Sequence, residues 1–161
     1  MITKKQLLNI KFNLKNIMSE QEIEDFEMED ESIESEGGSG DFAKLASILL
    51  HSQTQVHTLH LQTQSYSEHK ALQGYYEGID ALVDGIIESF QGKYGILKDY
   101  KMVGSLKDLN NDEEIIKYFE TLARYCELKR EKLPQDGFLK NQYDTVDEFI
   151  SSTIYKLKFL G

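Results

Sequence analysis

An all-α fold with an acidic N-terminal arm is predicted by three features of this sequence. After Asp41, apolar residues recur at steps of three and four, which is the period of an amphipathic helix. Between Glu20 and Glu36 the chain carries ten carboxylates and no Lys or Arg, which is the composition of a solvated segment. At 161 residues it has room for one ordinary domain. We therefore expect an arm over residues 1–40 and a four-helix bundle over residues 41–161.

The arm divides into two parts. Leu8 to Lys15 alternate strictly between apolar and polar residues, which favours a strand, yet a helical stripe through Leu7, Ile10, Leu14 and Ile17 also fits. Both a strand and a short helix thus stay open for residues 7–18. Residues 20–40 form the acidic linker, which ends in the flexible sequence Gly37-Gly38-Ser39-Gly40. The basic, apolar residues 1–18 predict a protein partner, reached by adding a strand to its exposed sheet edge.

The first two helices are expected to form a hairpin. The first runs from a cap at Asp41 to about Thr63, with an apolar stripe of Phe42, Leu45, Leu49, Val56 and Leu59. The second begins near Ser65 to Ser67, where serine caps a helix, and stops at Gly92 or Gly95. Its apolar residues are Leu72, Tyr75, Tyr76, Ile79, Leu82, Val83, Ile86 and Phe90.

The other two helices are expected to form a second hairpin. The third begins at an Asn111-Asp112 cap and buries Ile115, Ile116, Phe119, Leu122, Ala123 and Cys126. Cys126, the single cysteine, is predicted to be a small buried apolar group. Pro134 separates this helix from the last one, which carries Val146, Phe149, Ile150, Ile154 and Leu157. The only long join spans about residues 93–110, and two short joins flanking one long crossover is the ferritin-like connectivity.

Charge and hydropathy exclude several classes of function. The formal net charge of −10 argues against binding of nucleic acid, because phosphate neutralisation needs clustered Lys and Arg. The same balance disfavours an anionic membrane surface, and no apolar run approaches the roughly 18 residues of a membrane span. The first residues lack the apolar segment of a signal peptide, so we expect a cytoplasmic protein.

The candidate site involves histidines and carboxylates of the first two helices. All four histidines lie between His51 and His69, so the later helices cannot supply the Glu-x-x-His pairs of an intramolecular di-iron site. On the second helix, polar residues recur at three- and four-residue steps and form one stripe: His69, Gln73, Glu77, Asp80, Asp84 and Glu88. Imidazole and carboxylate together suit iron or zinc. His51 lies off this arrangement and is expected at the surface.

The segment from His57 to Glu88 resembles helices A and B of the Dps-type mini-ferritins. His57, His69, Asp84 and Glu88 stand at the spacings of that family's ligands, and His60 is the alternative first histidine. The resemblance implies metal ligands at His57 or His60, His69, Asp84 and Glu88, with iron as the metal, in a site shared between subunits of a homo-oligomer. The chain departs from the family in having no Trp, Gln73 in place of an acid, and an acidic arm.

The residue sequence from Leu59 to Leu72 also resembles that of small ferritin-like proteins of bacteriophages, and this resemblance is closer than the one to the mini-ferritins. It implies a protein of the infected bacterial cell or of the virion. Two functions therefore stay open. One is a non-enzymatic interaction protein of a phage particle or its assembly, and the other is a metal-binding protein that oxidises or sequesters iron.

Overall fold

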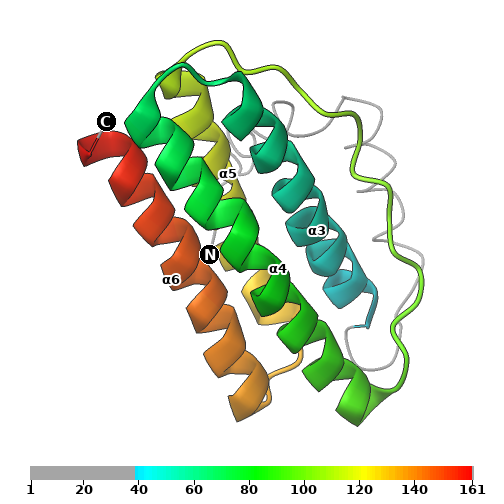
Figure 1. Ribbon diagram of the computed structural model, residues 1–161. Helices are drawn as coiled ribbons and strands as arrows, with labels where there is room; N and C mark the ends of the chain where they lie inside the picture. Colours follow the sequence, from blue (N-terminus) through cyan, green and yellow to red (C-terminus); the bar gives the residue numbers. More distant parts are fainter. Residues whose placement is uncertain (1–38, 161) are drawn as a thin grey trace, which may run out of the picture.

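The computed structural model describes residues 39–160, and these form an all-α protein (Figure 1). The four long helices are α3 (Ser39–Gln62), α4 (Tyr66–Tyr94), α5 (Asp112–Lys129) and α6 (Gly137–Phe159), with a short 3₁₀ helix, η2 (Arg130–Lys132), after α5. The expected strand or helix at 7–18, and residues 20–38 of the acidic linker, lie outside the described residues. Ser39 and Gly40 belong to α3, and Asp41 lies in its first turn rather than at its cap.

Most of the predicted helix ends are confirmed by local geometry. The Ser65 hydroxyl accepts a hydrogen bond from the Glu68 amide at 3.3 Å, and the Asn111 side chain accepts one from the Glu114 amide at 2.9 Å. Both bonds satisfy amides that the first turn of a helix leaves unpaired. Of the two predicted stops for α4, the structure uses Gly95, whose φ of 90° lies in the region that glycine adopts without strain.

The helices are paired as two antiparallel hairpins that pack on each other. α3 contacts α4, α5 contacts α6, and the hairpins meet mainly through α4 and α6 with a smaller contact between α3 and α5. Residues 95–111 return along the length of the molecule from the end of α4 to the start of α5 (Figure 1). α4 and α5 therefore run in the same direction.

Side chains of α3 hold this crossover in place. Gln55, only 2% exposed, donates through Nε2 to the Lys107 carbonyl and accepts from the Lys107 amide, both at 2.8 Å. The Ser47 hydroxyl accepts from the Lys101 amide at 2.8 Å. Because these bonds satisfy part-buried backbone groups of the crossover, this segment is packed onto α3.

Aromatic side chains fill the middle of the core. Tyr75 is fully buried, with its ring centroid 4.9 Å from that of Phe119 and 5.6 Å from that of Phe149. Its hydroxyl lies 2.8 Å from the buried Ser52 hydroxyl, and burial raises the pKa of Tyr75 well above its ordinary value. Cys126 is buried as predicted, and burial likewise raises its pKa.

Candidate functional site

Three predicted site residues, His57, His60 and His69, gather where α3 turns into α4. α3 ends at Gln62 and α4 begins at Tyr66, so the last turns of one helix lie against the first turns of the other. His60 is 7% exposed, His69 is half-buried and His57 is exposed. The hairpin thus places His60 directly against His69, and His57 lies next to His60.

His60 and His69 exchange hydrogen bonds through their rings and backbones. The His60 Nδ1 atom lies 3.0 Å from the His69 carbonyl oxygen, and the His69 Nδ1 atom lies 3.1 Å from the His60 carbonyl oxygen. A carbonyl oxygen only accepts, so both Nδ1 atoms carry hydrogen and donate. The two rings stack with centroids 3.7 Å apart and planes 28° apart. This pair of residues is called the histidine clasp below.

The clasp provides a hydrogen-bond donor for a carbonyl at the end of α3. The last four carbonyls of a helix have no amide partner within the helix, and His60 is one of the last four residues of α3. His69 supplies the missing donor to the His60 carbonyl. The negative end of the α3 dipole lies at the same place and favours such a donor. The clasp therefore joins the end of α3 to the start of α4.

His57 extends the clasp into a larger aromatic cluster. Its ring stacks on Tyr76 with centroids 4.2 Å apart and planes 18° apart. The Tyr76 ring meets His60 edge to face at 5.1 Å. Tyr76, predicted as a core residue, is in fact half-buried at the edge of the core, where it covers the clasp.

Asp84 and Glu88 lie far from the histidines in the same chain. Both are exposed on α4, and the 15 residues from His69 to Asp84 correspond to about 22 Å along a helix. Asp84 lies instead near Tyr100 of the crossover, where burial and this carboxylate raise the tyrosine pKa. Within residues 39–160, His, Cys, Asp and Glu form no group of three that could hold a metal ion.

Near the histidines, polar side chains of α4 form hydrogen bonds with one another. Lys70 Nζ donates to Gln73 Oε1 at 2.7 Å, and Gln73 Nε2 donates to Glu77 Oε1 at 2.8 Å. Gln73 therefore links Lys70 to Glu77 in a surface chain of hydrogen bonds.

The prediction that His51 lies at the surface is wrong. His51 is half-buried, and both of its ring nitrogens are shielded from solvent. It stands four residues from Ser47 and four from Gln55, the two side chains that bind the crossover. His51 is therefore on the crossover side of α3, a relationship that helix periodicity alone did not reveal.

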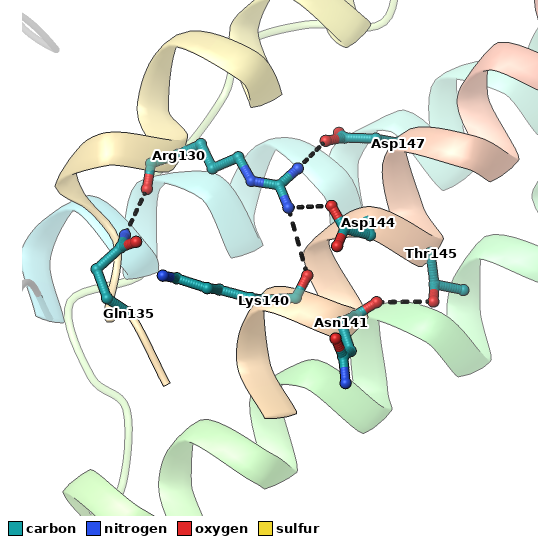
Figure 2. A network of polar contacts seen from close by, with 7 residues as sticks. All are labelled: Arg130, Gln135, Lys140, Asn141, Asp144, Thr145 and Asp147. Atoms are coloured by element: carbon teal, nitrogen blue, oxygen red, sulfur yellow. Dashed lines mark hydrogen bonds and ion pairs between the residues drawn. The ribbon is translucent and has the colours of Figure 1, made fainter. Parts of the chain in front are cut away.

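A second polar cluster, which the sequence interpretation missed, joins η2, directly after α5, to α6 (Figure 2). Arg130 binds Asp144 through Nη2 and Asp147 through Nη1, the latter at 2.8 Å. Burial raises the pKa of Asp147, although the nearby Arg130 guanidinium opposes this shift. The sequence signal for this cluster was a pair of acids three residues apart, Asp144 and Asp147, after Pro134. The cluster fixes the return of the chain into α6.

These observations define an all-helical protein whose one histidine cluster within the described residues forms a hairpin clasp. Comparison with protein-family models adds a match over residues 60–157 to DUF5856, a family of unknown function. The match covers more than half of the chain, and the chain belongs to this family. Neither curated proteins nor solved structures gave a match. In residues 39–160, every helix is too short or too polar to cross a membrane.

Proposed function

We propose that this chain is a non-enzymatic interaction protein built on a ferritin-like four-helix bundle. The connectivity supports the fold: two antiparallel hairpins, α3–α4 and α5–α6, are joined by one crossover that runs the length of the molecule (Figure 1). The resemblance to ferritin-like proteins of bacteriophages suggests the setting, which is a phage particle or its assembly.

The histidine clasp is the observation that carries this proposal. In a metal site both imidazoles present a nitrogen lone pair to the same ion. His60 and His69 instead stack at 3.7 Å, and each uses Nδ1 to bind the other's backbone. Stacked rings direct their in-plane lone pairs side by side rather than toward one point. The arrangement therefore supports a structural role for the two histidines.

The packing between the four helices also supports a role without metal chemistry. In di-iron carboxylate proteins of this architecture, inward-facing Glu and His hold the metals between the helices. Here the space between α4, α5 and α6 is filled by aromatic side chains, with Tyr75 in contact with both Phe119 and Phe149. The resulting packed bundle is the support from which the N-terminal arm would engage a partner.

Metal analysis tests this proposal. The purified full chain would be incubated with Fe²⁺, Zn²⁺ or Mn²⁺, desalted, and its metal content measured by mass spectrometry. We expect only substoichiometric metal under each condition, held non-specifically by the acidic surface. Stoichiometric iron, together with oxidation of added Fe²⁺, would overturn the proposal.

A metal site shared between two copies is the second candidate, and one observation favours it. Because Nδ1 of His60 and of His69 donates to a carbonyl, each Nε2 keeps a lone pair, which is the usual outer-shell arrangement of a metal-binding histidine. Asp84 and Glu88 of a second copy could complete such a site only in a homo-oligomer. Metal should then dissociate when the protein is diluted to monomers, and a monomer that retains metal would contradict this candidate.

A further inference from the structure

A polar cavity of about 360 Å³ lies at the end of the molecule where the α3–α4 hairpin meets the start of α5. Its volume is within the range of small-molecule sites, roughly 300–1,000 Å³. Leu59, Leu109 and Ile115 provide apolar lining, and the rest is polar. No histidine lines it, so this cavity is separate from the rings of the histidine clasp.

Glu68 is the most informative residue of this cavity. It is 9% exposed, and Oε2 accepts a hydrogen bond from the Thr63 hydroxyl. The Thr63 hydroxyl also accepts from the Ser65 amide at 3.2 Å, so its own position is fixed by the turn. A carboxylate held in this way has further lone pairs with which to accept hydrogen bonds from a ligand.

The charges around the cavity select a cation. Its lining includes the carboxylates of Glu68 and Asp112 and contains no Lys, Arg or His. The carbonyl end of α3, which carries partial negative charge, lies at Gln62 beside the cavity. At the starts of α4 and α5, the Glu68 and Glu114 amides already donate to the caps Ser65 and Asn111. An anion would therefore meet two carboxylates and capped amides.

The size and lining of the cavity distinguish an organic cation from a metal ion. A bare divalent ion needs several oxygen ligands within about 2.0–2.6 Å. A cavity of about 360 Å³ lined partly by leucine and isoleucine is much larger than this. An alkylammonium group instead combines three N–H donors with an apolar stem, and the stem matches Leu59, Leu109 and Ile115.

We propose that this cavity binds an alkylammonium group, with Glu68 as the acceptor and Leu59, Leu109 and Ile115 as the contact surface for its stem. Two sources share this chemistry: a free polyamine and a lysine side chain of a protein partner. The charged end would lie against Glu68 and Asp112, and the aliphatic part would cover the apolar lining.

Titration of the ¹⁵N-labelled full chain, followed by NMR, tests the proposal. Spermidine represents the free polyamine, and Nα-acetyl-lysine methylamide represents a partner's lysine. We expect saturable shifts confined to residues 62–68 and 109–115. Glu68→Gln should weaken binding about tenfold or more, because a hydrogen bond to a charged group is lost. Glu77→Gln removes the same charge from an exposed position of α4 and should leave binding unchanged.

A second variant keeps the test decisive if Glu68→Gln does not fold. Leu109→Trp fills the cavity while retaining Glu68, and it should abolish the shifts. Binding of spermidine alone assigns a free polyamine, and binding of the lysine mimic alone assigns a partner's side chain. The absence of saturable shifts with both ligands would overturn the proposal, as would equal weakening by Glu68→Gln and Glu77→Gln.

Discussion

His60 and His69 each donate from Nδ1 to the backbone carbonyl of the other, at 3.0 and 3.1 Å, while their rings stack at 3.7 Å. The pair closes the α3–α4 hairpin at the level of its turn, and it lies inside the region that matches the family model. Side chains at the spacing of metal ligands thus form a tertiary contact that needs no metal.

Removal of the clasp should destabilise the hairpin. We expect His60→Ala and His69→Ala each to lower the free energy of unfolding by about 1–3 kcal/mol, through a lost hydrogen bond and a lost ring contact. A double-mutant cycle should give a coupling energy of about 1 kcal/mol or more between them. His57→Ala, at an exposed position, should cost less than either. Additive effects of His60→Ala and His69→Ala in urea unfolding would contradict the clasp.

Gly78 should not tolerate a side chain, whereas two other glycines of α4 should. A Cβ atom at Gly78 would lie 2.6 Å from Cζ of Phe149, so the ring would have to move. We expect Gly78→Ala to destabilise the protein by about 1–3 kcal/mol. A Cβ at Gly74 or Gly85 meets nothing within 4 Å, so alanine there should stabilise α4 by about 0.5–1 kcal/mol. Thermal unfolding of the three variants provides the comparison.

Gln55 should protect the crossover, residues 95–111, from proteolysis. Gln55→Leu retains much of the side-chain volume but leaves the amide and carbonyl of Lys107 without their Gln55 bonds. We expect trypsin to cleave after Lys101 and Lys107 faster in this variant, because the crossover opens locally more often. Gln53→Leu, at a half-buried position of the same helix, is the matched control. Equal cleavage rates in both variants would show that Gln55 does not hold the crossover.

The charge of Asp147 should make stability depend on pH. Burial raises the pKa of Asp147 in the folded protein above its unfolded value, so the folded state binds more protons between these two values. The stability contributed by the protonated acid is therefore lost as pH rises through this window, starting near pH 4. Asp147→Asn should gain stability relative to the parent between pH 3 and pH 7 in urea unfolding. If the parent instead gains stability relative to Asp147→Asn as pH rises, the pKa of Asp147 is lowered rather than raised by folding.

The basic, apolar residues 1–18 provide a prediction for the interaction role. If they dock on a partner's sheet edge, their deletion should abolish partner association and leave the melting temperature unchanged. Replacing Ile10 and Phe12 with Ser in the full chain should have the same effect, since both lie on the apolar edge of the expected strand. A clear drop in melting temperature after deletion would instead mean that these residues pack on their own domain.

Features fixed by neighbouring residues could be predicted from the sequence. The caps at Ser65 and Asn111 and the stop at Gly95 depend on side chains or backbone freedom within one turn, and the structure has all three. The clasp could not be predicted, because it depends on the ring orientations of His60 and His69 across a hairpin. The shielding of His51 likewise required knowledge of where a crossover of extended chain would lie.

For the candidate site, too, the sequence indicates what lies within one hairpin and not what lies beyond it. Spacing along the sequence correctly grouped the histidines of the hairpin, since three residues separate the two helices. The resemblance placed Asp84 and Glu88 in this site only across two subunits, and within one chain a straight helix puts these acids several turns away from the histidines.

The tautomers of His60 and His69 test the central claim most directly. Long-range ¹H–¹⁵N NMR of the full chain distinguishes a protonated Nδ1 from a protonated Nε2, and the same sample can be titrated with Zn²⁺. We expect both rings to carry hydrogen on Nδ1, and we expect their Nε2 signals to stay unchanged as one equivalent of Zn²⁺ is added. Hydrogen on Nε2 of either ring, or a saturable shift of both Nε2 signals with Zn²⁺, would contradict the clasp as a purely structural contact.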